Sequence, residues 1–269
     1  RGALLQIAEG VRHLHGLRIV HRDLKVRAGP YSAGWQAPEV LSRRIAGGDA
    51  TPGGGGDDES GGGGGSSGGG GGGSRRAQAA DVFALGCIFF HCLAPAAHPF
   101  GEWWEREANV LRGHAPQLPR IAAPLPDAHD LVRRMVRADP DARPSAADVC
   151  RHPFFWGDER RLAFLVDFSD RLEREDGASS ALLLCVERDA ARVVGRAWDR
   201  RVDAALLEDA GRYRSYDRAS ARDFLRLVRN KRHHFHELPP AARALLAPLP
   251  SGLLHYVESL FPRLLMHCW

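Results

Sequence analysis

Paired cysteines, strand patterns and membrane-length apolar runs are all scarce in this chain of 269 residues. Its five cysteines are scattered without a CxxC pair, which indicates free thiols in a reducing compartment rather than a disulfide framework. We find no apolar run near the roughly 20 residues that span a bilayer. The start at Arg1 has neither a methionine nor a signal-like stretch. We therefore expect a soluble fragment of a longer protein without a transmembrane segment.

Apolar residues at helical spacing dominate the sequence and predict a mainly α fold. The predicted helices cover residues 3–15, 80–94, 104–112, 127–138, 145–150, 159–175, 199–209, 220–235, 239–247 and 251–266. Strand signals are few, at residues 182–186 and 192–194. A net charge of +4 suits a polyanionic partner but does not identify one.

A glycine-rich tract interrupts the first half at about residues 47–76. Gly, Ser, Asp and Glu bury too little apolar surface to offset the entropy of ordering the chain, so the tract predicts a disordered insertion. A phosphate-binding loop would instead place a few glycines between a strand and a helix.

Four motifs follow one another in the first half, at residues 21–25 (HRDLK), 34–39 (GWQAPE), 81–87 (DVFALGC) and 141–145 (DARPS). Their order resembles the C-lobe of a protein kinase. The resemblance implies that Asp23 accepts the proton of a substrate hydroxyl and that Lys25 contacts the transferred phosphate. It also implies structural roles, in which Glu39 pairs with Arg143 and Asp81 ties the catalytic loop to the following helix.

The kinase pattern is incomplete in this chain. The Asn that ends a kinase catalytic loop and the DFG motif, which together hold Mg²⁺, are both missing after Lys25. The N-lobe lies outside the chain. We therefore expect no unaided binding of Mg-ATP and no kinase activity. An evolved pseudokinase and a gene-model artefact explain the gap equally well.

The second half carries a different succession of motifs: HPFFW at residues 152–156, RSY at 214–216, DFLR at 223–226, RNKRHH at 229–234 and FPRLL at 261–265. Together with the kinase motifs, it resembles the inositol-requiring ER-stress sensors, a family of transmembrane kinase–endoribonucleases. RNase L is a more distant relative of the same architecture. The resemblance implies a partial kinase C-lobe at residues 1–157 and a helical KEN ribonuclease domain at residues 158–269.

The family's nuclease groups fall on Tyr216, Arg229, Asn230 and His234. These residue types suit RNA cleavage without a metal, because a hydroxyl and an imidazole move protons while a guanidinium and an amide hold a phosphate. Asn230 and His234 are four residues apart and share a face if the helix continues. Neighbouring cations suggest a surface that binds RNA: Arg222, Arg226, Lys231 and Arg232. His233, His234 and His236 do not share a helical face, so we expect no metal site.

The implied reaction uses the substrate's own 2′-OH and leaves a 2′,3′-cyclic phosphate and a 5′-OH. His234 is the expected general acid and Tyr216 the expected base, although these roles are reversible. Arg229 and Asn230 would stabilise the phosphorane.

The family further implies RNA stem-loop substrates in the unfolded protein response and a homodimer or higher oligomer. It places the parent protein in the ER membrane with this part on the cytosolic face. Two other functions stay open. One is a catalytically dead dimerisation scaffold, and the other is a Ser/Thr kinase whose missing segments are artefacts. The sequence does not identify the target RNA.

Overall fold

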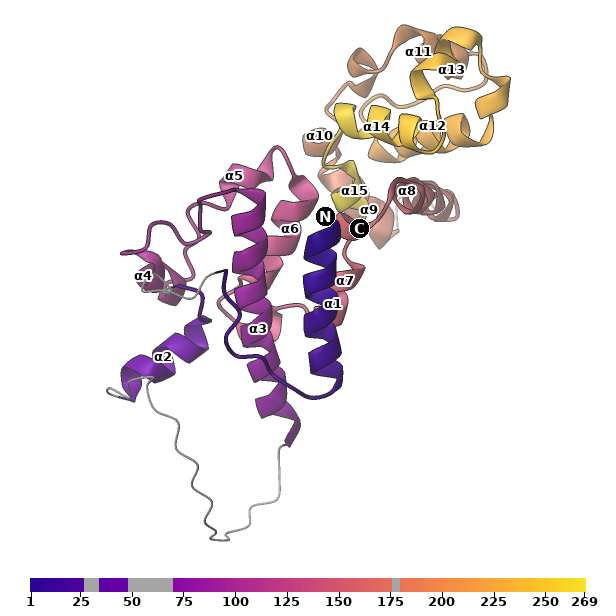
Figure 1. Ribbon diagram of the computed structural model, residues 1–269. Helices are drawn as coiled ribbons and strands as arrows, with labels where there is room; N and C mark the ends of the chain where they lie inside the picture. Colours follow the sequence, from indigo (N-terminus) through magenta and orange to yellow (C-terminus); the bar gives the residue numbers. More distant parts are fainter. Residues whose placement is uncertain (27–33, 48–69, 176–179) are drawn as a thin grey trace. The chain divides into compact units, whose positions relative to one another are not determined.

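The computed structural model describes residues 1–26, 34–47, 70–175 and 180–269. The chain divides into two compact units, residues 1–155 and 156–269 (Figure 1). Within the described ranges every regular element is a helix and none is a strand. The predicted mainly α fold is therefore confirmed.

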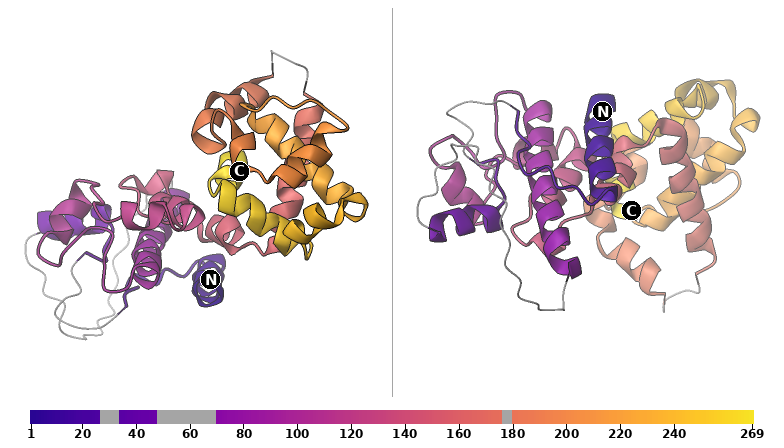
Figure 2. Two further views of the ribbon diagram at one scale, coloured as in Figure 1. Left: turned by 90° about the horizontal axis from the view of Figure 1, so that it is seen from above. Right: turned by 60° about the horizontal axis from the view of Figure 1, so that its bottom comes forward.

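Unit 1 is built around a long apolar helix, α3, which lies beside α1 and packs on α6 (Figure 1, Figure 2). Its helices are α1 (Gly2–Gly16), α2 (Pro38–Ala46), α3 (Gly70–Leu93), α4 (Arg106–Leu111), α5 (Pro119–Ala122), α6 (Pro126–Met135) and α7 (Ala146–Arg151). Gly86 permits the close approach of α3 and α6, since a Cβ there would lie 2.8 Å from the Cβ of Met135. Phe83, Phe89 and Phe90 of α3 are fully buried.

The start of α3 corrects one prediction. The glycine-rich tract was expected to be disordered through residue 76, but α3 begins at Gly70. Adding residues to an existing helix costs far less than nucleating one, and the buried part of α3 supplies that nucleus. Arg76 also forms an ion pair with Asp141 at 3.2 Å. Residues 48–69 of the tract lie outside the described residues.

One stretch of α3, Gly73–Leu93, is long and apolar enough to cross a membrane by those two criteria alone. No membrane-length run was expected from the sequence. In the structure 61% of its most apolar window is buried, as in a helix at the centre of a protein core.

Unit 2 consists of eight α-helices in its described residues, around Trp198. They are α8 (Asp158–Glu173), α9 (Ala181–Arg188), α10 (Ala190–Val193), α11 (Ala204–Gly211), α12 (Ala221–His233), α13 (Pro240–Leu246), α14 (Ser251–Leu260) and α15 (Leu264–Cys268). The Trp198 ring packs edge-on against the Phe224 ring with 5.4 Å between ring centroids, and Phe224 packs edge-on against Phe261 with 4.7 Å between centroids. Helix α12 packs along α8, and this pair carries the candidate site.

Two predicted strands in unit 2 are wrong. Residues 182–186 lie in α9 and residues 192–193 in α10. The Ser180 hydroxyl accepts the N–H of Leu183 at 3.2 Å and starts α9, which buries Val186 while Leu184 is 58% exposed. Tertiary packing on one helical side thus overrides the strand preference of a short apolar run. The helix predicted at 251–266 is broken near Pro262, as expected of a proline.

Candidate active site

The candidate site is organised by α12, whose first turn is held by two side chains. The Ser220 hydroxyl accepts the N–H of Asp223 at 3.1 Å, as an N-cap does. The carboxylate of Glu187, from α9, accepts the Ser220 hydroxyl at 2.8 Å and the N–H of Arg222 at 2.9 Å. Beyond this start, Phe224, Leu225, Leu227 and Val228 are buried in the core. The helix is therefore fixed at its start and along its apolar side.

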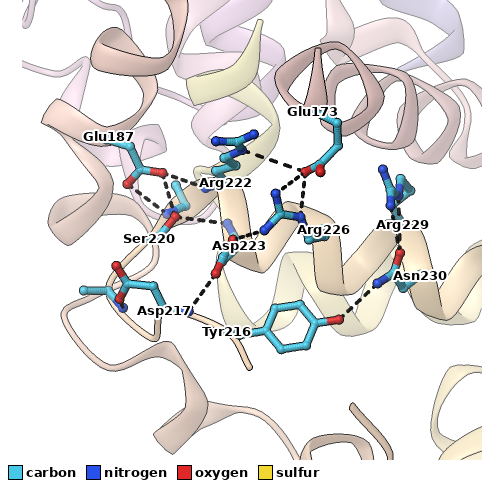
Figure 3. A network of polar contacts seen from close by, with 12 residues as sticks. Glu173, Glu187, Tyr216, Asp217, Ser220, Arg222, Asp223, Arg226, Arg229 and Asn230 are labelled. Atoms are coloured by element: carbon cyan, nitrogen blue, oxygen red, sulfur yellow. Dashed lines mark hydrogen bonds and ion pairs between the residues drawn. The ribbon is translucent and has the colours of Figure 1, made fainter. Parts of the chain in front are cut away.

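Three of the four expected nuclease residues are joined by hydrogen bonds (Figure 3). The Asn230 amide donates to the Tyr216 hydroxyl oxygen at 3.0 Å, and its carbonyl accepts from the Arg229 guanidinium at 3.1 and 3.3 Å. Arg229 also donates to Asp170 of α8 at 3.0 Å. The Tyr216 side chain is buried, with its ring edge-on to Trp198 at 6.2 Å. A tyrosine, an amide and a guanidinium are thus held in one row.

The fourth residue, His234, lies just past the end of α12. The helix stops at His233, so the predicted continuation through residue 235 is wrong, but the N–H of His234 still bonds to the Asn230 carbonyl at 2.9 Å. Its imidazole Nδ1 lies 3.0 Å from a Glu237 carboxylate oxygen. Because a carboxylate accepts and does not donate, Nδ1 carries the proton and Nε2 faces elsewhere. The side chain is 62% exposed, which leaves it accessible to a large substrate.

The predicted RNA-binding surface of four cations is wrong for two of them. The Arg226 side chain is 8% exposed and forms ion pairs with Glu173 and Asp223. Lys231 is also buried and forms an ion pair with Asp209 of α11. The charges of Arg226 and Lys231 are paired with carboxylates inside unit 2, so these side chains are not available to bind phosphates.

The ion pair of Glu173 and Arg226 favours the charged form of both side chains. Burial raises the pKa of Glu173, but the hydrogen bond and charge of Arg226, with the charges of Arg222 and Arg229, outweigh it and hold the pKa below its usual value. Burial lowers the pKa of Arg226, and Glu173 and Asp223 more than reverse this. Glu173 and Arg226 therefore stabilise each other's charge within the site.

Sequence reasoning missed the carboxylates that hold the site: Asp170, Glu173 and Glu237. A signal for the first two was present. Asp170 and Glu173 are three residues apart on α8, and their partners Arg229 and Arg226 are three residues apart on α12. This spacing puts each pair on one helical side, but only packing of α8 on α12 matches them.

Two of the kinase-like motifs of unit 1, HRDLK and DVFALGC, meet at Asp81. Its carboxylate accepts the backbone N–H groups of His21 and Arg22, each at 2.8 Å, and bonds to the His15 ring at 3.0 Å. Arg22 has a left-handed backbone with φ of 67°, and this contact stabilises the unusual turn. Burial raises the pKa of Asp81, but these hydrogen bonds outweigh it and lower the pKa. Asp81 thus ties the HRDLK segment to α3.

Glu39 and Arg143 are far apart in the sequence but are in contact in the structure. The guanidinium of Arg143 donates to both carboxylate oxygens of Glu39 at 2.8 Å and to the carbonyls of Arg137, Ala79 and Ala138. The Arg143 side chain is fully buried. This is a structural contact of unit 1.

The residues present do not suit Mg-ATP. Asp23 is 70% exposed and pairs with Lys25 at 2.9 Å. Between Lys25 and Gly34 the sequence has no Asp or Asn to serve as a metal ligand, and Mg²⁺ needs such oxygen ligands. We therefore assign no phosphoryl-transfer step to unit 1.

Fold and site together define a helical protein that joins a kinase-like C-lobe to a ribonuclease-type unit. Residues 161–269 match the family model Ribonuclease 2-5A. The chain is 37% identical, over 97% of its length, to the serine/threonine-protein kinase/endoribonuclease IRE1a of Arabidopsis thaliana. It is 37% identical over 98% to the corresponding IRE2 of Homo sapiens, and 33% identical over 99% to the sensor for unfolded proteins in the ER, ire1, of Schizosaccharomyces pombe.

The chain is thus a relative of the IRE1 kinase/endoribonucleases, and the resemblance predicted from its motifs is confirmed. It spans 31%, 30% and 28% of the three relatives' own lengths. A solved structure of the Rad53 kinase domain and SCD2 overlaps 56% of this chain and 53% of its own, with a TM-score of 0.38 and 19% identity, which is too low to bear on the fold.

Proposed function

We propose that residues 158–269 form a KEN endoribonuclease domain that cleaves RNA through protein side chains, behind a partial kinase C-lobe at residues 1–157. The observation that carries the proposal is the row Tyr216–Asn230–Arg229, with His234 one turn further along the chain. It combines two groups that move protons with two that bind a phosphate.

The proposed reaction begins at the 2′-OH of the substrate, which loses its proton to a base as its oxygen bonds to the adjacent phosphorus. The bond from phosphorus to the 5′-oxygen breaks, and an acid protonates that oxygen. The products are a 2′,3′-cyclic phosphate and a 5′-OH. His234 is the proposed acid and Tyr216 the proposed base, and exchanging the two roles gives the same products.

The contacts of His234 and Arg229 support these assignments. The bond of Nδ1 to Glu237 orients the His234 ring and leaves Nε2 for the transferred proton. In Arg229, each terminal nitrogen carries two hydrogens. The bonds to Asp170 and Asn230 take one from each, so one N–H on each nitrogen remains for a phosphate oxygen. Such a pair suits the charge of the phosphorane.

The proposal extends to the biological setting. The relative from Schizosaccharomyces pombe is named as a sensor for unfolded proteins in the ER. We infer an RNA stem-loop substrate in unfolded-protein signalling and a homodimer or higher oligomer. We further infer a parent protein in the ER membrane, with this chain on its cytosolic face. Unit 1 would contribute to assembly without transferring phosphate.

The test is cleavage of an RNA stem-loop by the chain in the presence of EDTA. His234→Asn is expected to lower kcat by about 10²–10⁴-fold, the usual contribution of a general acid. The matched control is His233→Asn, the same change at the preceding exposed residue, which should keep the wild-type rate. Near-wild-type cleavage by His234→Asn would overturn the assignment. No cleavage by the wild-type chain, with dimers still seen by sedimentation, would favour the scaffold instead.

A further inference from the structure

Tyr216 lies in the connection between α11 and α12, so no helix holds its backbone. The neighbouring residue Asp217 is gripped from two sides instead. Its N–H donates to the carboxylate of Asp223 at 2.6 Å, and its carbonyl accepts from the Trp198 indole at 3.1 Å. Trp198 is fully buried in the core. The Asp223 contact therefore holds the backbone of this loop on α12, while Asn230 holds the Tyr216 hydroxyl.

Asp223 is itself fixed on its other oxygen. That oxygen accepts from the Arg226 guanidinium, which also donates to Glu173 of α8 at 2.6 Å. The side chains of Arg226 and Asp223 are 8% and 14% exposed. Buried hydrogen bonds between full charges are short, strong and hard to replace by water. The hydrogen bonds on both of its oxygens therefore fix the orientation of the Asp223 carboxylate.

The bonds form two branches that leave α8 and meet at Tyr216. Figure 3 shows the first from Arg229 onward and the second from Glu173 onward. One runs from Asp170 through Arg229 and Asn230 to the tyrosine hydroxyl. The other runs from Glu173 through Arg226 and Asp223 to the backbone beside the tyrosine. The hydroxyl of Tyr216 and the backbone beside it are therefore both held in place by the same two helices, α8 and α12.

We propose that Asp223 is a positioning residue of the ribonuclease reaction, and that Arg226 and Glu173 hold it in place. The inference rests on the proposed function of this site. Asp223 touches no reacting atom and acts through Tyr216. A displacement of about 1 Å in a reacting group costs on the order of 10²-fold in rate, so a loop that loses this anchor should cleave slowly while still binding RNA.

The experiment combines Asp223→Ala with Tyr216→Phe in the full chain, under steady-state conditions with a stem-loop RNA. Asp223→Ala alone is expected to lower kcat by about 10²-fold and to change KM less than about threefold. In the Tyr216→Phe background the same change should cost less than about threefold, because residues that act through one another are not additive.

Asp223 also starts α12, so a purely structural role needs its own control. Glu187→Ala removes the acceptor for the Ser220 hydroxyl and for the Arg222 N–H at the same helix start, and it leaves the bond from the Asp217 N–H to Asp223 in place. This variant should have a lower Tm than the wild type. Its kcat, measured at temperatures below the unfolding transition, should equal the wild-type value. If Asp223→Ala fails to fold, the milder variant Asp223→Asn replaces it. Asn keeps an oxygen for the Asp217 N–H, and we expect kcat to fall by about tenfold.

Three outcomes are separable. If the wild-type chain cleaves RNA and Asp223→Ala keeps its kcat, the positioning role is refuted and the proposed function stands. The role is equally refuted if Asp223→Ala costs its full factor in the Tyr216→Phe background. If the wild-type chain does not cleave RNA, the proposed function fails, and the positioning role fails with it.

Discussion

Replacing Lys231 by methionine tests the reassignment of a residue that the sequence places in an RNA-binding run. In the structure the side chains of Lys231 and Asp209 are 7% and 9% exposed and form an ion pair. Methionine fills a similar volume but leaves the Asp209 carboxylate buried and unpaired. The expected effect is a loss of folding stability rather than a loss of RNA contacts.

The magnitude follows from the burial of both partners. Removing one partner of a buried ion pair costs about 3–5 kcal/mol, a large fraction of the roughly 5–15 kcal/mol that stabilises a domain. For a unit of this size that corresponds to a fall in Tm of roughly 10–25 °C. Changing Asp209 to asparagine as well should recover a good part of this loss, because the unpaired charge is then gone.

The assay is thermal unfolding of the full chain by circular dichroism, with hydrogen exchange measured on peptides of α12 to assign the change to unit 2. Arg232→Met is the matched control, since Arg232 is the adjacent cation and is only half-buried. It should shift the Tm by a few degrees at most, as surface changes do.

RNA binding at several salt concentrations completes this test. Each lost phosphate contact lowers the slope of log K against log salt by about 0.7–0.9. The slope should be unchanged for Lys231→Met, measured below its Tm. An unaltered Tm together with a slope reduced by about one contact would refute the reasoning and restore Lys231 to the RNA-binding surface.

Three further predictions concern the rest of the chain. Arg143→Met should destabilise unit 1 by about 3–5 kcal/mol, because it leaves Glu39 without its buried partner; an unchanged urea midpoint would contradict this. The pKa of Glu173 is lowered in the fold from its ordinary value of about 4.5, so the stabilisation by its ion pairs is complete above that value and is lost as pH falls through the folded value. The stability gap between wild type and Glu173→Gln should therefore narrow from pH 5 to 3, and a widening gap would be inconsistent with the ion pairs. RNA cleavage should be unchanged by EDTA, and activity lost in EDTA but restored by Mg²⁺ would rule out cleavage by side chains alone.

Periodicity and motif order carried most of the fold. The 3.6-residue spacing predicted α8, α12 and the long core helix, because burial of one side of a helix leaves a direct trace in the sequence. It failed where that trace is short. The short apolar run at residues 182–186 is compatible with either a strand or a helix, and its packing within unit 2 favours the helix.

For the candidate site, the sequence by itself determined which residue types are present and how they are spaced. Tyr216, Arg229, Asn230 and His234 could be named from the motif, and three of them are hydrogen-bonded in one row. Only the tertiary structure decided which cations are available to a substrate. Arg226 and Lys231 are held by Glu173 and Asp209, carboxylates from other helices. The physical reason is that an ion pair depends on the distance between side chains brought together by packing, and spacing along one helix does not contain that distance.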